Sequence, residues 1–125
     1  IKTLIDNNNL MNVFYKKIFQ HTSGVEVFSE SSTDVSSNHW LSCILVNEKI
    51  AGFRNEDLRL ALEADNIESR PLWKPMHLQP IFNGAPYYGA NVSESLFMNG
   101  LCLPSGSNLT LQEKQRILKV LSRFS

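Results

Sequence analysis

Residues 69–80 read Ser69-Arg70-Pro71-Leu72-Trp73-Lys74-Pro75-Met76-His77-Leu78-Gln79-Pro80. The three prolines exclude a regular helix or a central strand here, because each fixes its own φ, lacks an N–H and restricts the residue before it. We predict a stiff, extended loop that carries a guanidinium, an indole, an ammonium and an imidazole at close spacing. Such a loop suits a flat, anionic ligand, such as a nucleotide or a phosphorylated cofactor. The alternative is a surface connection in which the indole only covers the core.

The chain before this loop begins with a helical pattern. Apolar residues recur at helical spacing from Leu4 to about Phe19. The run Asn7-Asn8-Asn9 disfavours a helix interior, because Asn side chains compete for nearby backbone groups. The helix therefore either starts after this run, with Asn9 as its cap, or is locally weak there. Residues 21–24 end it, with Gly24 as a C-terminal cap.

Two strands are predicted between this helix and the proline-rich loop. Residues 25–28 form a short strand candidate, and residues 29–37 are a polar loop rich in Ser, Thr and Asp. The clearest strand covers residues 39–46, which are dense in aromatic and apolar side chains. Its nearly continuous apolar character predicts cover on both faces. Residues 47–53 are expected to form a loop or turn.

The remaining elements alternate helices and extended segments. Arg54 or Asn55 is expected to open a helix that ends near residues 64–66, with Asn55 a good cap and with Glu56 and Asp57 at the positive end of its dipole. Thr110 and Glu113 form a capping-box pattern at the start of the last helix. The other predicted segments are an extended piece at 67–69, an irregular connection at 81–91, a short helix at 92–99 and a buried strand at 101–103. The order predicts an α+β fold, with helices packed against a small, mainly antiparallel sheet.

Two blocks of the sequence resemble a known family. Residues 70–80 resemble a signature of the DegT/DnrJ/EryC1/StrS family of pyridoxal-phosphate-dependent sugar aminotransferases. Residues 92–97 and 100–107, which include Val92-Ser93-Glu94 and Gly100-Leu101-Cys102-Leu103-Pro104, provide a second match in the same order. The resemblance extends from about Trp40 to Phe124. It implies the C-terminal small domain of a fold-type I pyridoxal-phosphate transferase.

The resemblance also implies that the residues that carry out the reaction lie outside the matched region. In the family, the Schiff-base lysine and the cofactor phosphate cradle belong to a large domain that precedes the matched region. The chain has 125 residues, enough for one domain, and begins at Ile1 without an initiator Met. We therefore expect residues 1–125 to be a single C-terminal small domain of a longer parent. We expect the chain to contain no catalytic or cofactor-binding residues, and to be inactive alone.

Arg70 is the first candidate for a substrate-binding residue. A guanidinium makes bidentate contacts with a carboxylate or a phosphate. By similarity, Arg70 would bind either the carboxylate of the amino donor or the diphosphate of a nucleotide sugar. The alternative is a salt bridge to a surface acid such as Glu68 or Glu94.

Trp73, Lys74 and His77 complete the predicted substrate-binding set. Trp73 would stack on a uracil or sugar ring, while Lys74 would neutralise phosphate charge. Lys74 as a solvated surface residue is the competing interpretation. His77 would donate or accept a neutral hydrogen bond to substrate or cofactor phosphate, although a lone loop histidine is more often structural.

Composition narrows the class of protein further. Twelve basic and twelve acidic residues give a formal net charge of zero, which argues against nucleic-acid binding by bulk charge. We find no apolar run of the roughly 20 residues that a membrane helix needs. Cys43 and Cys102 lie in apolar surroundings and are expected to be small buried side chains in a reducing cytoplasm, not a disulfide or metal pair. The three histidines show no metal-ligand spacing, so no metal is predicted.

The resemblance implies a cytoplasmic, homodimeric parent that uses pyridoxal phosphate. Its implied reaction transfers an amino group from glutamate to a nucleotide-linked 4-keto-6-deoxy sugar, with UDP as the nucleotide. One alternative is a free-standing module that binds a nucleotide sugar without catalysis. Another is a structural remnant in which the proline-rich loop is rigid scaffolding. Binding of a uridine diphosphate sugar by the chain would argue against this last alternative.

Overall fold

The apolar segments of the sequence form one antiparallel sheet. The computed structural model describes residues 2–30 and 32–125, so Ile1 and Ser31, the latter within the predicted loop 29–37, lie outside the described residues. The sheet has the strand order β1-β2-β4-β3. Its strands are β1 (Val25–Val27), β2 (Ser42–Val46), β3 (Arg70–Pro71) and β4 (Gly100–Leu103). The predicted α+β class with an antiparallel sheet is confirmed.

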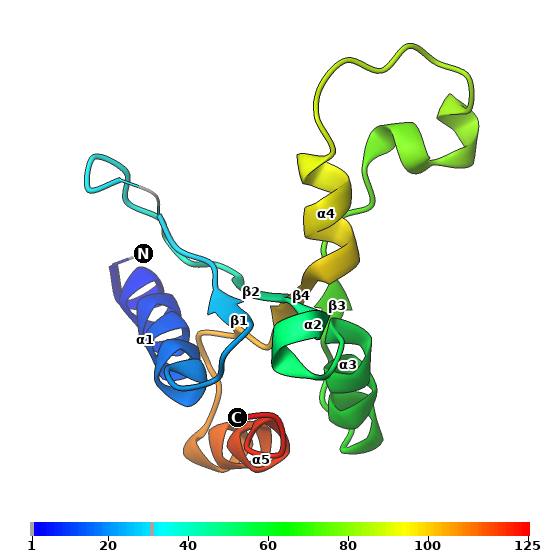
Figure 1. The fold of residues 1–125 in the computed structure, drawn as a ribbon. Coiled ribbons are helices and arrows are strands. Elements are labelled where there is room, and N and C mark those ends of the chain that lie inside the picture. The colour runs from blue at the N-terminus through cyan, green and yellow to red at the C-terminus, as the bar shows by residue number, and fades with distance from the viewer. Residues whose placement is uncertain (1, 31) are drawn as a thin grey trace.

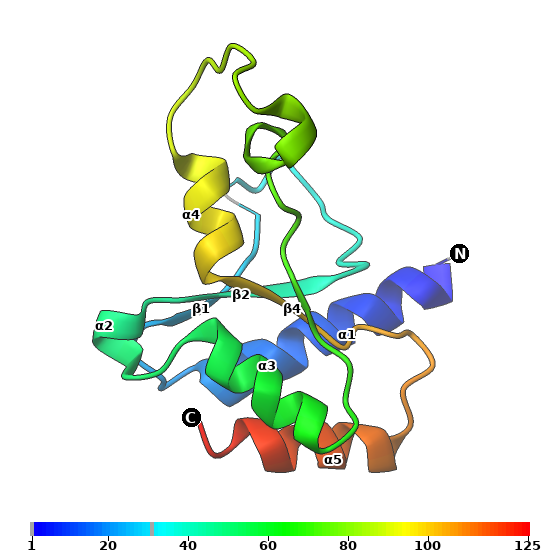
Figure 2. The ribbon, with the colours of Figure 1, turned by 90° about the vertical axis from the view of Figure 1, so that its right-hand side faces the viewer.

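Helices cover the two faces of this sheet unequally (Figure 1). One face is covered by α1 (Lys2–Phe19), α3 (Asn55–Ala64) and α5 (Leu111–Leu121). The shorter α4 (Val92–Asn99) stands on the opposite face, as Figures 1 and 2 both show. A four-residue helix, α2 (Glu48–Ala51), follows β2 within the segment predicted to be a loop or turn. It ends at Gly52, which adopts a left-handed φ of 79°.

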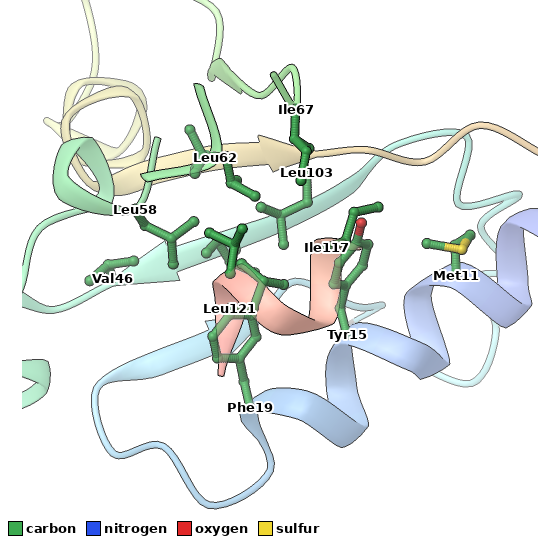
Figure 3. Packing of buried hydrophobic residues seen from close by; sticks show 13 residues of the cluster. Met11, Tyr15, Phe19, Val46, Leu58, Leu62, Ile67, Leu103, Ile117 and Leu121 are labelled. Atoms are coloured by element: carbon green, nitrogen blue, oxygen red, sulfur yellow. The ribbon is translucent and has the colours of Figure 1, made fainter. Parts of the chain in front are cut away.

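The hydrophobic core fills the space between the sheet and the three helices on its first face (Figure 3). Tyr15 of α1, Leu58 of α3 and Leu121 of α5 are all fully buried there. Ile44 and Leu101 of the two central strands close the core from the sheet side. The core residues thus come from both ends of the chain, so the chain is held together across its full length.

The strand β2 is shorter than the predicted strand over residues 39–46. His39 adopts a positive φ of 43°, which an extended strand does not allow. The N–H groups of His39 and Trp40 are bonded locally, to Ser37 Oγ and Asn38 Oδ1, so they do not join the ladder. The cover predicted for both faces is complete on one face only, because Cys43 and Leu45 are half-buried while their strand neighbours are buried.

The asparagine caps that the sequence allowed at two helix starts do not form, for related reasons, although α3 does begin at Asn55, one of its two expected openings. Helix α1 includes the asparagine run, and the side chain of Asn7 donates to the carbonyl of Ser107, 3.0 Å away. In α3, Asn55 is the first helical residue and donates to the carbonyl of Gly100. The carboxylate of Asp57 accepts from the N–H of Arg54, 2.8 Å away, at the start of α3. In both helices, the side-chain amide of an asparagine donates to a backbone carbonyl far away in the sequence instead of forming a local bond.

Two segments project from the sheet on the same side as α4. One is formed by residues 28–30 and 32–41, and the other is the segment 72–91, which we call the proline arm (Figure 1). The arm leaves the sheet at β3 and returns through α4. It contains two short 3₁₀ turns, η1 (Met76–Leu78) and η2 (Pro80–Phe82). As predicted for residues 69–80, the prolines allow no regular helix or central strand: residues 70 and 71 form a two-residue edge strand, and only 3₁₀ turns follow.

Candidate functional site

A pocket of about 410 Å³ lies where the base of the proline arm meets the sheet. Arg70 and Trp73 contribute to its lining, together with Trp40 at the end of the other projecting loop. Cys102 of β4 and Ser105, which follows this strand, form part of its wall. The pocket therefore joins a guanidinium to two indoles, the combination that binds flat, anionic groups.

A larger hollow of about 690 Å³ lies between β1, α2 and α4. Its lining includes Glu26, Glu48 and Lys49 and no aromatic side chain. Two carboxylates against one ammonium disfavour an anionic ligand, since like charges repel. We therefore place the candidate site in the smaller pocket.

The structure places Arg70 on the edge strand, with its side chain 77% exposed. Its Nε donates to Glu68 Oε1 at 2.7 Å. This is one of the two surface salt bridges that the sequence left as the alternative to ligand binding. An exposed pair of this kind contributes roughly 0–1 kcal/mol. A ligand carboxylate or phosphate can therefore displace Glu68 from the guanidinium at small cost.

Both indoles of the pocket are largely open to solvent. Trp73 is 68% exposed and Trp40 is 65% exposed. Large aromatic faces left open beside a pocket are typical of surfaces that a ligand or another protein segment covers. From the sequence, Trp40 is expected only as part of a strand over residues 39–46. The signal for its role was the Asn38-His39-Trp40 break, where local side-chain bonds turn the chain out of the ladder.

The other two predicted site residues lie outside the pocket lining. Lys74 is exposed, and its carbonyl accepts a hydrogen bond from the side chain of Gln79. His77 is 19% exposed, and its Nε2 lies 2.8 Å from Glu94 Oε1 on α4. Its ring packs on Tyr87, with ring centroids 3.9 Å apart. The structure thus brings Arg70 and Trp73 together and uses His77 to connect the arm to α4.

The described lysines do not provide the shielded amine that pyridoxal phosphate would need in this pocket. A cofactor that binds a lysine needs an amine shielded from water beside a polar phosphate cradle. Within residues 2–30 and 32–125, no lysine lines the 410 Å³ pocket, and every lysine except the half-buried Lys114 is exposed. Lys114 belongs to α5, on the far side of the sheet (Figure 2).

The described residues show neither a metal-ligand cluster nor a helix suited to a bilayer. Among the described residues, no three His, Cys, Asp or Glu side chains gather as metal ligands would. None of the described helices combines the length and the apolar character needed to cross a bilayer.

Comparisons with known proteins place this geometry in context. EpsN of Bacillus subtilis, provisionally named a pyridoxal phosphate-dependent aminotransferase, is 40% identical over 111 residues, 86% of this chain and 28% of its own. The GDP-perosamine synthase of Escherichia coli O157:H7 is 31% identical over 88% of this chain and 28% of its own. DesI, solved in the presence of its TDP-sugar product, matches with a TM-score of 0.79 at 22% identity, over 96% of this chain and 31% of DesI.

The likeness to DesI establishes the fold as one that occurs within a longer chain of solved structure. The chain belongs to the DegT/DnrJ/EryC1/StrS aminotransferase family, whose model matches residues 1–122. It spans under a third of the length of the relatives named above.

Proposed function

We propose that residues 1–125 form the C-terminal small domain of a cytoplasmic, homodimeric sugar aminotransferase that depends on pyridoxal phosphate. The proposed reaction moves an amino group from glutamate to a nucleotide-linked 4-keto-6-deoxy sugar. The observation that carries this proposal is the pocket that joins Arg70 to two indoles in a member of this family. A guanidinium and aromatic faces match the two recognisable parts of a nucleotide sugar, its diphosphate and its base.

Each predicted residue has a role in this proposal. Arg70 exchanges Glu68 for a ligand phosphate or carboxylate, and Trp73 stacks on the base or the sugar ring. Lys74, exposed one residue further along the arm, neutralises phosphate charge. His77 acts through the position of the arm, because its Nε2 is engaged by Glu94.

We place the cofactor in the part of the parent that corresponds to the unmatched length of the relatives. The described lysines do not fit it, so we assign no residue of this chain to pyridoxal phosphate. The chain alone is therefore expected to be inactive. Titration with pyridoxal phosphate, followed by the absorbance of a lysine-bound cofactor, tests this. A saturable one-site band in the 125-residue chain, with Lys74 the first suspect, would contradict the assignment.

Calorimetric binding of nucleotide sugars to the chain tests the pocket. The nucleotide is the variable to resolve, because we propose UDP while relatives are named for GDP-perosamine or were solved with a TDP-sugar. Arg70→Ala and Trp73→Ala should each weaken binding about tenfold, since one stacking or charged contact contributes on the order of 1–3 kcal/mol.

Matched controls separate the pocket from the general surface. Arg54→Ala removes an exposed guanidinium that pairs with Asp57 outside the pocket, and Tyr88→Ala removes an exposed aromatic ring of the arm. Both variants should bind the nucleotide sugar as tightly as the unsubstituted 125-residue chain does. Equal losses in all four variants would argue against the pocket. Binding by the chain, together with an absence of cofactor binding after extension upstream, would instead favour the non-catalytic module.

A further inference from the structure

Two cysteines meet on the half-open face of the sheet. Cys43 of β2 and Cys102 of β4 are directly opposite in the antiparallel register. Their Sγ atoms lie 3.6 Å apart, and both thiols are free. Opposite residues of an antiparallel pair point to the same face, with Cβ atoms about 4.5–5.5 Å apart. From their apolar sequence surroundings, both cysteines are expected to be small buried side chains and not a disulfide; the strand register brings them together across 59 positions.

The backbone at this pair suits a covalent bond. The N–H of Phe28 donates to the carbonyl of Cys43 at 2.8 Å, so the backbone polar groups of Cys43 face β1. Cys43 and Cys102 are therefore a non-hydrogen-bonded pair of β2 and β4. Such pairs bring Cα atoms to about 4.5 Å, and disulfides span Cα distances of about 4.4–6.8 Å. Rotation of the side chains, without strand movement, is enough to join the sulfurs.

The two thiols differ in reactivity. Cys102 contributes to the lining of the 410 Å³ pocket and is 8% exposed, whereas Cys43 is half-buried and lies outside that lining. The hydrogen bond between the two thiols lowers the pKa of Cys102, while the same bond, with burial, raises the pKa of Cys43. Arg70 is paired with Cys102 across the next strand interface. A thiol of lowered pKa beside a thiol of raised pKa, with the two sulfurs 3.6 Å apart, is the arrangement of an attacking and a resolving cysteine.

We propose that Cys43 and Cys102 are a reversible oxidation site that hydroperoxides convert into a cross-strand disulfide. The Cys102 thiolate attacks one peroxide oxygen, the O–O bond breaks, and a sulfenic acid forms while the other oxygen leaves as alkoxide or hydroxide and takes up a proton. The sulfur of Cys43 then attacks Cys102 Sγ, and the hydroxyl group leaves as water with the thiol proton of Cys43. The two thiols lose two electrons and the peroxide gains them. A dithiol reductant reverses the change.

This proposal is independent of the proposed function, because it needs only the sheet. The 125-residue chain is treated with hydrogen peroxide at low protein concentration, then its free thiols are counted and its mass is measured. Both thiols should disappear together, with the loss of two hydrogen atoms from a monomer, and dithiothreitol should restore them. Covalent dimers as the only disulfide product would overturn the proposal.

Single variants test the two assigned roles. In Cys43→Ser, the sulfenic acid at Cys102 should persist long enough to be trapped by dimedone. In Cys102→Ser, the remaining thiol should react about tenfold more slowly, because the more ionised thiol reacts faster. Equal rates in the two variants would contradict the order of attack.

The unsubstituted 125-residue chain, unfolded in guanidinium, provides a control that needs no variant. There the paired loss of thiols should slow to the rate of two separate cysteines. An unchanged rate on unfolding would show that the sheet does not create the site, and would overturn the proposal.

Discussion

Nε2 of His77 lies 2.8 Å from Oε1 of Glu94, and this contact joins the proline arm to the helix that ends it. Tyr87 stacks on the same imidazole from the far part of the arm. The imidazole is therefore held by a carboxylate on one side and an aromatic ring on the other. These two contacts hold the proline arm in place, although the arm has few buried apolar side chains of its own. The arm begins next to the pocket that contains Arg70 and Trp73.

Glu94→Ala should loosen the proline arm without unfolding the core. Loss of the hydrogen bond costs about 1 kcal/mol of local stability, so amide exchange in residues 72–91 should accelerate about fivefold. Hydrogen exchange followed by mass spectrometry measures this. Glu63→Ala is the control, since Glu63 pairs with Arg59 on α3, away from the arm. Equal acceleration of arm exchange in both variants would contradict this role for Glu94.

Tyr15→Phe should destabilise the chain by about 1–3 kcal/mol, because it leaves the carbonyl of Pro104 without its buried donor. The Tyr15 hydroxyl donates to this carbonyl at 2.5 Å, and burial raises its pKa. Tyr87→Phe removes a matching bond to the carbonyl of Ala90 from an exposed tyrosine. Urea unfolding should show a much smaller loss for this control. Similar unfolding midpoints for the two variants would mean that burial does not determine how much each hydrogen bond contributes to stability.

Leu58→Ala should cost about 2–5 kcal/mol, because it opens a cavity in the closed core. Leu58 is fully buried, whereas Leu60 on the same helix is 48% exposed. Leu60→Ala therefore gives a matched control with the same change in helix propensity and a small effect. Thermal unfolding distinguishes them. A loss for Leu60→Ala as large as that for Leu58→Ala would place the core on the wrong face of α3.

Stability should depend on pH through Glu113. Hydrogen bonds from the backbone N–H and the hydroxyl of Thr110 lower its pKa below the ordinary 4.5. A lowered folded-state pKa adds stability that is complete above the unfolded pKa and is lost as pH falls through the folded value.

Glu113→Gln should therefore flatten the decline of the unfolding temperature below pH 4.5, the ordinary pKa of this carboxyl group. Other carboxylates with lowered pKa values, Glu56 and Asp57 among them, titrate in both proteins. The difference between the two curves isolates Glu113. Parallel curves would indicate that the capping box does not form in solution.

Oxidation of the proposed dithiol should stabilise the chain. The bond would close a loop of 59 positions, which the chain-entropy model values at about 4 kcal/mol. Denaturant unfolding with and without dithiothreitol compares the two forms. The Cys43→Ser variant should show no difference between these conditions. Identical midpoints for oxidised and reduced parent chain would mean that the bond strains the sheet as much as it restrains the unfolded chain.

Signals carried by neighbouring residues predicted structure well. The pairing of Thr110 with Glu113 is confirmed as a capping box, since each side chain bonds the backbone N–H of the other. The prolines of residues 69–80 are confirmed to exclude a regular helix and a central strand, with Pro71 confined to an edge strand. In both cases the deciding contact or restriction lies within four residues, so it can be seen in the sequence.

Relationships between distant residues could not be predicted in this way. The opposition of Cys43 and Cys102 depends on strand register, which the whole sheet fixes. The asparagine run is helical against its local tendency, and Asn7 there donates to the carbonyl of Ser107, 100 positions away, a bond that no local pattern reveals. The pocket residues Arg70 and Trp73 were predicted together, but Trp40 was not, because a turn outside the ladder brings it there.

The two-residue strand β3 has a consequence for association between sheets. An open edge of unpaired N–H and carbonyl groups is a template for the strand of another molecule. Pro71 offers no N–H, and the chain leaves the sheet into the proline arm directly after it. Pro71 therefore ends the ladder and also blocks the addition of another strand at this edge, so the β3 side of the sheet is protected from edge-to-edge association.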